Sequence, residues 1–293
     1  MSNKIISGNS FADVYSKAIN ILYNDFEFET SPRNLKIREC LNANLVISDP
    51  TKNLWKCSDK KLTMPTAYTK KEICLYLNGY NLADLFSKAS PFWDQIKNSD
   101  NTINSAYGNL IFNPSLSDNL SQFEWAYYSL SKDKDSRQAF MRYNNNQHQI
   151  FGNKDLPCTF IQIFHIRENK LHSTVIMRSN DVCSGTIHDI PSFTLFQYLM
   201  YLRLKESDYP DLELGEYVHI ANSFHLYEKD FEITKNRIDV GLEENSFPLP
   251  KNWRVIKSYD IEAIIQKKFY GVEIDESKWV YPENKEFYNW LLS

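Results

Sequence analysis

The chain has 293 residues, of which 42% are apolar and 14% aromatic, so it is long and apolar enough to bury a sizeable core. Only eight residues are glycine and they stand singly, which excludes a glycine-rich phosphate loop and means that side chains must hold any bound nucleotide. The formal net charge of -4, without a long block of one sign, argues against a general nucleic-acid binder.

The apolar runs and the cysteines narrow the class of protein further. No apolar run approaches the roughly 18 residues of a membrane helix, and the N-terminal segment lacks the apolar stretch of a signal peptide. We therefore expect a cytoplasmic protein with no membrane partner and no nucleic-acid partner. The five cysteines are odd in number and irregularly spaced, which predicts reduced thiols and no metal site.

The first half of the chain is mainly helical in its pattern. Apolar spacing predicts a helix over Phe11–Leu22, then a short strand at Leu45–Pro50 that ends in a turn. A second helical stretch covers Lys70–Ala89, with a break near Gly79. Phe123–Leu130 is expected to form another helix.

The centre of the chain changes to a period of two. Phe160–Arg167 and Leu171–Arg178 are β-rich runs joined by three turn residues, which predicts a hairpin within one sheet. Ser192–Lys205 is apolar at helical spacing and predicts a central buried helix, and Tyr217–Ala221 is typical of a short strand. The last 70 residues mix weak helix and strand patterns. Because no repeat or flexible linker interrupts the chain, we expect a single α+β domain over residues 1–293.

Cys158 is a candidate nucleophile because it follows Pro157 at the start of the first strand of the hairpin. A thiol at a strand edge can be exposed, and arginines nearby would favour the thiolate, which is the nucleophilic form. An inert, half-buried cysteine is the other interpretation. The residues alone leave both open.

Several arginines are candidate phosphate ligands. Arg178–Asp181 follows the second strand of the hairpin, and its arginine and serine suit a phosphate, although an ordinary polar turn is the alternative. Arg33 and Arg137 stand in loops, where each is either a phosphate ligand or a solvated arginine.

Two further polar positions are open to more than one interpretation. Glu72 lies near the start of an apolar helix, where a carboxylate complements the helix dipole. His225 and Tyr227 are two residues apart, so an extended backbone would direct both side chains to the same side. They could present two hydrogen-bonding groups to a hydroxyl-bearing ligand, or form a packed aromatic pair.

Most of these candidate residues fall in six short motifs, whose order along the chain resembles that of the thymidylate synthase family. The resemblance runs from about Arg33 to Tyr227. The motifs are Glu72-Ile73-Cys74-Leu75-Tyr76-Leu77-Asn78-Gly79, Phe92-Trp93-Asp94, Ala106-Tyr107-Gly108, Leu156-Pro157-Cys158, Met177-Arg178-Ser179-Asn180-Asp181 and His225-Leu226-Tyr227. The resemblance implies a large mixed β-sheet flanked by helices. It also implies a homodimer in which the two sheets pack back to back.

Two departures from the family pattern concern the base. The family places histidine after the nucleophile and asparagine at the position that reads the uracil edge, where this chain has Thr159 and Asp189. Both substitutions look like the deoxycytidylate hydroxymethylase branch. An amide matches the N3–H donor and O4 acceptor of uracil, whereas cytosine offers an N4 donor and a bare N3 acceptor. A carboxyl group accepts from N4, and it closes the second hydrogen bond when it or N3 carries a proton. Asp189 therefore points to dCMP or CMP.

The resemblance also implies a role for each site residue. The expected catalytic residues are Cys158, Glu72, Asp189 and Tyr107. The expected nucleotide ligands are Arg33, Arg137, Arg178 and Ser179 for the phosphate and His225 and Tyr227 for the sugar, besides Asp189 for the base. Arg137 would act from the partner subunit. Asp181 and Trp93 would face 5,10-methylenetetrahydrofolate, the co-substrate.

The resemblance thus predicts transfer of a one-carbon unit to C5 of dCMP or CMP and addition of water, which gives the 5-hydroxymethyl nucleotide and tetrahydrofolate. The alternatives are a dUMP-directed thymidylate synthase or hydroxymethylase, and a non-catalytic nucleotide-binding relative. Two further departures weaken the match. Gln138 follows Arg137 where the family usually has a second arginine, and the C-terminal segment differs from the family's short apolar tail.

Overall fold

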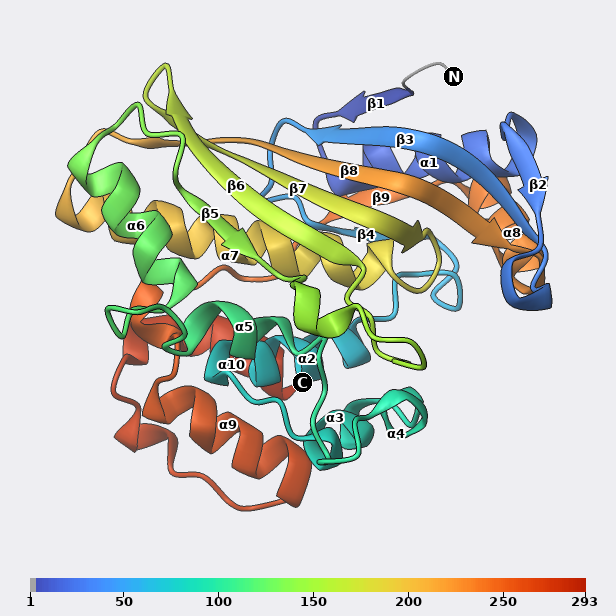
Figure 1. The fold of residues 1–293 in the computed structure, drawn as a ribbon. Helices are drawn as coiled ribbons and strands as arrows, with labels where there is room; N and C mark the ends of the chain where they lie inside the picture. Colours follow the sequence, from blue (N-terminus) through green and yellow to red (C-terminus); the bar gives the residue numbers. More distant parts are fainter. Residues whose placement is uncertain (1–3) are drawn as a thin grey trace.

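A mixed β-sheet forms the centre of the molecule, which the computed structural model describes over residues 4–293. Its strands are β1 (Ile5–Gly8), β2 (Phe28–Thr30), β3 (Ile37–Ile47), β5 (Phe140–Arg142), β6 (Thr159–Arg167), β7 (Lys170–Asp181) and β8 (Glu213–Tyr227). They lie in the order β1-β3-β8-β7-β6-β5, with β2 added beside β3 (Figure 1). The pairs β1–β3 and β7–β8 are parallel and the other pairs are antiparallel. Two short strands, β4 (Leu54–Lys56) and β9 (Glu243–Asn245), pair apart from this sheet.

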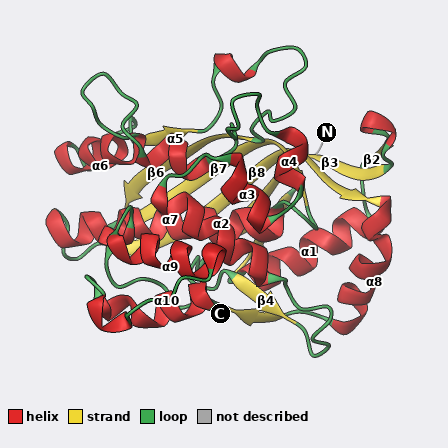
Figure 2. Cartoon of the chain, turned by 90° about the horizontal axis from the view of Figure 1, so that it is seen from below, coloured by secondary structure: helices red, strands yellow, loops and turns green. Residues whose placement is uncertain are grey.

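Helices lie against one face of the sheet. They are α1 (Phe11–Asn24), α2 (Thr66–Asn78), α3 (Ala83–Ala89), α4 (Phe92–Ile96), α5 (Tyr107–Phe112), α6 (Gln122–Lys132), α7 (Thr186–Ser207), α8 (Phe231–Val240), α9 (Tyr259–Tyr270) and α10 (Lys285–Leu292). In Figure 1, α7 runs along the lower face of the sheet and α2, α5, α9 and α10 form a further layer beneath it. Figure 2, seen from below, shows these helices in front of the strands. This mixed sheet flanked by helices confirms the expected α+β class.

Most elements predicted from periodicity are present. The helix expected from Phe11 is α1, and the stretch from Lys70 to Ala89 is divided into α2 and α3 after a left-handed Gly79. The predicted hairpin is formed by β6 and β7, whose turn residues Glu168 and Asn169 have positive φ. None of the described helices combines the length and apolarity needed to cross a membrane.

Three predicted boundaries were wrong. The strand expected at Leu45–Pro50 is the end of the longer β3, and the strand expected at Tyr217–Ala221 is the middle of β8. Helix α7 begins at Thr186, six residues before the predicted start. Its first turn is built by polar groups, because the Gly185 N–H and the Thr186 hydroxyl both donate to the carbonyl of Asp181. The apolar pattern could not reveal a first turn made by polar residues.

Helix α7 is buried over most of its length because the sheet covers one side of it and α2 and α6 cover others. Its buried apolar side chains include Phe193, Leu195, Phe196 and Leu199. The amino end of α7 lies at the end of β7, and the chain enters β8 after the helix. This crossover places the carboxyl ends of β7 and β8 and the first turn of α7 at one edge of the sheet.

Gly108 permits a close contact between α5 and α2. A Cβ atom at this position would lie 1.9 Å from the carbonyl oxygen of Tyr76 and 2.3 Å from its Cα. Because these are backbone atoms of a buried helix, no side-chain rotation can relieve the overlap. The α2–α5 packing, which positions two of the predicted site residues, therefore depends on glycine at 108.

Replacement of Gly108 by alanine should therefore lower the free energy of unfolding by about 3 kcal/mol, at the upper end of overpacking costs. The matched control is Gly152→Ala, where the added Cβ meets open space and the cost comes from the positive φ of 86°, about 1 kcal/mol. Urea unfolding of the two variants measures the difference. Equal stabilities would contradict the close-contact explanation.

Candidate active site

The candidate nucleophile Cys158 stands directly before β6, at the partly exposed end of the strand. Its carbonyl accepts the N–H of Arg178 at 2.9 Å, so the neighbouring strand β7 fixes the backbone at this point. All five cysteines are free thiols, as predicted, but Cys40, Cys57 and Cys74 are buried. Position therefore favours Cys158 over these three as a reactive thiol.

The segment before Cys158 is held by side chains. Arg178 donates from Nη2 to the carbonyl of Leu156 at 2.7 Å and from Nε to that of Pro157 at 3.2 Å. Two further hydrogen bonds hold Asp155, the residue before Leu156. Its buried carboxylate accepts both the N–H and the hydroxyl of Ser105. These contacts fix the backbone that carries the thiol.

Arg178 also sets the electrostatics at Cys158. Burial raises the pKa of the Cys158 thiol above its usual value, whereas the positive charges of Arg178 and Arg33 lower it and Asp189 raises it. In the free protein the thiol therefore stays protonated, and the two arginines stabilise a thiolate once a proton acceptor is available. The sequence-predicted residues Arg33 and Arg178 thus act electrostatically on the same sulfur, as does Asp189 when it is ionised.

Glu72 lies at the centre of a buried hydroxyl cluster on α2. Tyr68 and Tyr76, four residues before and after it, donate to Glu72 Oε1 at 2.6 and 2.9 Å. Trp93 donates its indole N–H to the Tyr68 hydroxyl at 3.1 Å, which adds a sequence-predicted residue to the cluster. Burial raises the pKa of Glu72 to about 7, although both hydroxyl donors lower it. A carboxyl that titrates near neutrality is suited to proton transfer.

Asp189 stands in the first turn of α7, where the residue is partly exposed but its carboxyl group is surrounded by protein. Burial, with the negative charge of Glu72 as a smaller cause, raises the pKa of Asp189 to about 8. Its carboxylate Oδ2 accepts one hydrogen bond, at 2.7 Å, from Nδ2 of Asn180. At neutral pH Asp189 therefore exists mainly as the acid, which has one donor and one acceptor.

Tyr107 connects the nucleophile segment to the Glu72 helix. Thr159, directly after Cys158, donates its hydroxyl to the Tyr107 hydroxyl at 3.0 Å. The Tyr107 ring stacks on Tyr76 and on Phe193, with centroids 5.6 and 5.7 Å apart. The predicted catalytic residues Glu72, Tyr107 and Cys158 thus lie in one contiguous set of contacts.

The predicted phosphate, sugar and folate residues that belong to β7 and β8 meet at the same edge of the sheet. In the β7–β8 register, Ser179 is paired with Ser223 and Asp181 with His225. His225 is buried and packs edge-on against Tyr227, with ring centroids 5.0 Å apart. Of the two interpretations that the sequence left open, the packed aromatic pair is present, and binding of a hydroxyl-bearing ligand stays a prediction.

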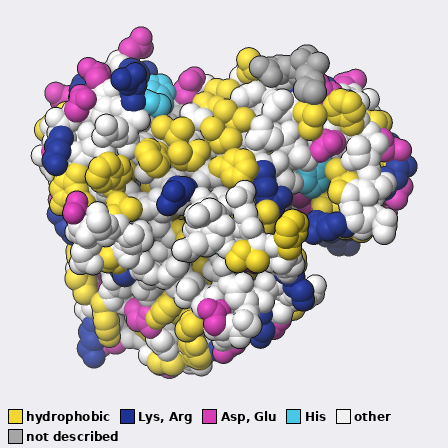
Figure 3. Space-filling model, viewed as in Figure 1, with side chains coloured by type: hydrophobic (Ala, Val, Ile, Leu, Met, Phe, Trp, Pro, Cys, Tyr) yellow, Lys and Arg dark blue, Asp and Glu magenta, His cyan; other side chains and the backbone are white. Residues whose placement is uncertain are grey.

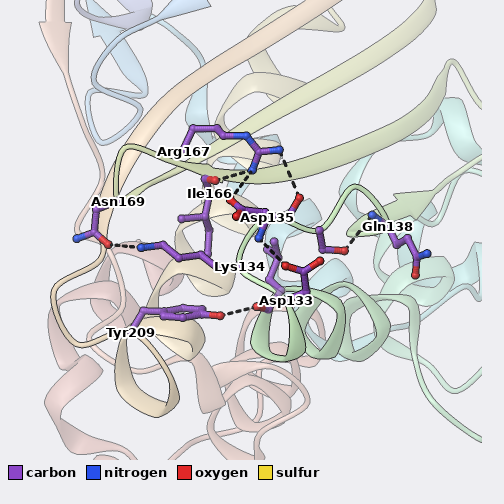
Figure 4. A network of polar contacts seen from close by, with 10 residues as sticks. Asp133, Lys134, Asp135, Gln138, Ile166, Arg167, Asn169 and Tyr209 are labelled. Carbon is purple, nitrogen blue, oxygen red and sulfur yellow. Dashed lines mark hydrogen bonds and ion pairs between the residues drawn. The ribbon is translucent and has the colours of Figure 1, made fainter.

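Arg137 is the predicted site residue that the structure does not bring to the others. It is exposed and lines a surface cavity of about 670 Å³ beside α6, together with Trp125 and Tyr128. Figure 4 shows how its segment is anchored to the β6–β7 hairpin: Arg167 donates to the Asp135 carbonyl, and Lys134 donates to the side chain of Asn169. Arg137 is thus carried on a fixed segment, outside the set of contacts that surrounds Cys158.

One group of side chains in the described chain has metal-ligand spacing. Asp181, Cys183 and Asp230 offer ligand atoms within 4.8 Å of one another. Burial raises the pKa of the Cys183 thiol to about 11, so this thiol is protonated at neutral pH and is a poor metal ligand. Asp181 uses Oδ1 to accept the Cys183 N–H at 2.9 Å. The group therefore contains a thiol that burial keeps protonated, and a protonated thiol does not suit a metal ion.

Sequence reasoning missed several residues that contact the predicted ones. Tyr68 and Tyr76 flank Glu72 at i±4 spacing, a pattern that could have indicated two donors on one helix face. His219 lies fully buried in β8 between Val218 and Ile220, where a polar residue on the inward face of a strand is unusual. Each was visible as a polar residue at an apolar position.

Comparison with known proteins places this geometry in context. The family model for thymidylate synthase matches residues 52–275. A thymidylate synthase of Bacillus atrophaeus is 27% identical over 225 residues, covering 75% of this chain and 90% of the relative. Thymidylate synthase 1 of Bacillus subtilis strain 168 is also 27% identical, with 75% and 74% covered. A deoxycytidylate 5-hydroxymethyltransferase of Enterobacteria phage T2 is 29% identical over 176 residues, with 56% and 70% covered.

The raised pKa of Glu72 predicts a pH-dependent stability difference. The native state holds the Glu72 proton up to pH of about 7, whereas the unfolded chain loses it near 4.5, so the wild-type free energy of unfolding falls across that window. Glu72→Gln has no such titration. Between pH 5 and pH 8 its free energy of unfolding should therefore rise by about 3 kcal/mol relative to that of the wild type. Urea unfolding at both pH values measures the difference, and parallel pH dependences would contradict the prediction.

Proposed function

Because this chain belongs to the thymidylate synthase family, we propose that it hydroxymethylates C5 of a cytidylate, dCMP or CMP. It is a folate-dependent one-carbon transferase, and its family acts on a nucleoside monophosphate with 5,10-methylenetetrahydrofolate. The observation that carries the choice of base is the partly enclosed Asp189, whose pKa is raised to about 8. The similarity to the deoxycytidylate enzyme of phage T2 supports the same choice.

Asp189 is suited to reading cytosine. The protonated acid donates from one oxygen to the bare N3 of the base and accepts from the N4 amino group with the other. Both hydrogen bonds are made without ionising either partner in a region of low polarity, where an unpaired charge would be costly. An asparagine at the same place would offer an NH₂ group and a carbonyl, which suit the uracil edge.

Cys158 is the proposed nucleophile on this base. Its thiol gives up its proton to solvent as Sγ bonds to C6 of the pyrimidine, and the C5=C6 electron pair becomes available at C5. C5 then takes up the one-carbon unit, which the folate supplies at the oxidation level of formaldehyde. Arg178 and Arg33 stabilise the sulfur charge as it develops, because their fields already act on Sγ in the free protein.

The second half of the reaction adds water. Loss of the C5 proton and departure of tetrahydrofolate from the one-carbon unit leave an exocyclic methylene group on C5. Water adds to this methylene as Sγ leaves C6. In the proposed step Glu72 orients that water and accepts its proton, a role that its pKa of about 7 supports. Tyr68 and Tyr76 hold the Glu72 carboxyl in position. The sum is nucleotide plus methylenetetrahydrofolate plus water, giving 5-hydroxymethyl nucleotide plus tetrahydrofolate.

The residues at the proposed folate position have chemistry that fits a flat, polar-edged ring. Phe92 is 53% exposed next to the buried indole of Trp93, which offers an apolar surface for a ring. Asp181 supplies a partly exposed carboxylate, an acceptor for ring N–H groups. In this proposal these residues bind and orient the folate while Glu72 and Cys158 act on the nucleotide.

The proposed phosphate site requires a second copy of the chain. Arg33 and Arg178 act electrostatically on Cys158 of their own chain, and Ser179 follows Arg178. Arg137 follows a segment that is anchored to the β6–β7 hairpin through Lys134 and Asp135. The outward face of the sheet supports a homodimer, because its half-buried side chains are largely apolar. They include Ile163, Thr174, Ile176, Val218 and Ile220. Figure 3 shows hydrophobic side chains gathered over this face. Back-to-back packing would bring the partner subunit's Arg137 to the phosphate.

Product analysis tests the proposed function. The purified protein is incubated with methylenetetrahydrofolate and CMP, dCMP or dUMP, and the nucleotide product is analysed by mass spectrometry. A gain of one CH₂O on a cytidylate is the expected result. Methylation of dUMP, or a gain of CH₂O on dUMP alone, would assign the protein to the other branches, and no product would favour a binding protein.

Asp189→Asn should shift the preference towards the uracil nucleotide, because an amide presents donors and an acceptor that match the uracil edge. Activity on dCMP should fall at least tenfold, as expected when a hydrogen bond to the base is lost. Tritium release from C5-labelled dCMP and dUMP measures the ratio. An unchanged ratio would refute the proposed role of Asp189.

Cys158→Ser should abolish product while nucleotide binding remains, because a hydroxyl is a far weaker nucleophile than a thiolate at neutral pH. Cys183→Ser, at the other partly exposed cysteine, serves as the matched control. Binding is followed by calorimetry and turnover by tritium release. An active Cys158→Ser variant would show that another residue is the nucleophile.

A further inference from the structure

A buried chain of hydrogen bonds leads from β8 to Asp189. The Tyr217 hydroxyl and His219 Nδ1 are 2.9 Å apart, and His219 Nε2 lies 3.2 Å from Oδ1 of Asn180. Asn180 then donates from Nδ2 to Asp189 Oδ2 at 2.7 Å. Tyr217, His219 and Asn180 are all buried, at 3% exposure or less. None of the three is needed to touch the nucleotide.

The chain has one consistent direction. Burial lowers the pKa of His219 to about 3, so its ring is neutral and has a single N–H. Oδ1 of Asn180 can only accept, and it also receives the hydroxyl of Thr186. Nε2 of His219 must therefore carry the proton, and Nδ1 accepts from Tyr217. With both neighbours donating to its oxygen, Asn180 presents its NH₂ group to Asp189.

This direction matters because a carboxylic acid has two arrangements. The proton can be on either oxygen, and exchanging the two converts a donor–acceptor pair that fits cytosine into one that fits uracil. A donor fixed against Oδ2 makes that oxygen an acceptor and leaves the proton on Oδ1. Without that donor the acid could adopt either arrangement and pair with either base.

We propose that Asn180, held by Thr186 and His219, is a positioning residue that determines which oxygen of Asp189 carries the proton and thereby which pyrimidine is accepted. The inference rests on the proposed base-reading role of Asp189. Tyr217 contributes indirectly through His219, because its hydroxyl sets the tautomer of that ring. The carboxyl alone does not decide the base, and its buried neighbours are part of the selection.

The principal test is Asn180→Leu, a substitution of similar shape without donors. The ratio of kcat/KM for dCMP to that for dUMP should fall about tenfold, mainly through a gain on dUMP and a lower kcat on dCMP. KM for dCMP should change little, because the phosphate and sugar contacts remain. Asn180 lowers the pKa of Asp189, so its loss should move the alkaline limb of the pH profile upwards by about one unit.

A pair of His219 variants separates positioning from general damage. His219→Leu removes the donor to Asn180 and should relax the base ratio as Asn180→Leu does. His219→Gln places an amide NH₂ near the position of Nε2 and should restore most of the wild-type ratio. Tyr288→Phe is the stability control, because it removes another buried hydroxyl, one that donates to Asp260 at 2.9 Å in the C-terminal region. It should lower stability and leave the base ratio unchanged.

The outcomes distinguish this inference from the proposed function. Wild-type turnover of dUMP alone overturns the proposed function, whatever the variants do. The positioning role is overturned if Asn180→Leu and His219→Leu keep both the wild-type base ratio and the wild-type pH profile. If neither leucine variant folds, the near-isosteric Tyr217→Phe decides: a lower dCMP-to-dUMP ratio supports the role, and an unchanged ratio and pH profile reject it.

Discussion

The parallel pairing of β7 with β8 is the constraint on which the candidate site depends. Parallel neighbours need a crossover, and here the crossover is α7, whose first turn starts where β7 ends. The pairing therefore brings three sets of residues to one edge: Ser179 and Asp181 at the end of β7, His225 at the end of β8, and Asp189 at the start of α7. Residues 44 positions apart in the chain become neighbours in this pairing, such as Ser179 with Ser223 and Asp181 with His225.

Burial of titratable groups gives this edge its chemistry. Loss of water raises the pKa of Glu72 to about 7 and that of Asp189 to about 8, and lowers that of His219 to about 3. Both carboxyl groups thus have pKa values near neutral pH, where the protonated and ionised forms coexist. The histidine stays neutral and acts as a hydrogen-bond donor. Such groups cost stability, and hydrogen bonds from Tyr68 and Asn180 offset part of that cost.

Periodicity predicted the elements that lie on the core, such as α1, α6 and the β6–β7 hairpin, because their apolar spacing is set by burial. It failed at the start of α7, where Thr186 and Gly185 make polar contacts that carry no apolar pattern. Motif order indicated the residues around Cys158, and the structure brings most of them together. It could not indicate His219 or Tyr68, whose importance comes from three-dimensional contacts with Asn180 and Glu72.

Selection between cytosine and uracil is a question of proton location as much as of residue type. An amide and a protonated acid each offer a donor and an acceptor side by side, so the type of residue and the location of its hydrogens together decide which base it fits. What distinguishes them is that the acid's proton is free to move between two oxygens, whereas the amide's hydrogens are not. A site that uses an acid must therefore hold the proton on one oxygen through hydrogen bonds from the side away from the base. Only buried neighbours without competing water can do so. The Tyr217–His219–Asn180 chain has that character, since each member is buried and neutral and its donors point towards Asp189.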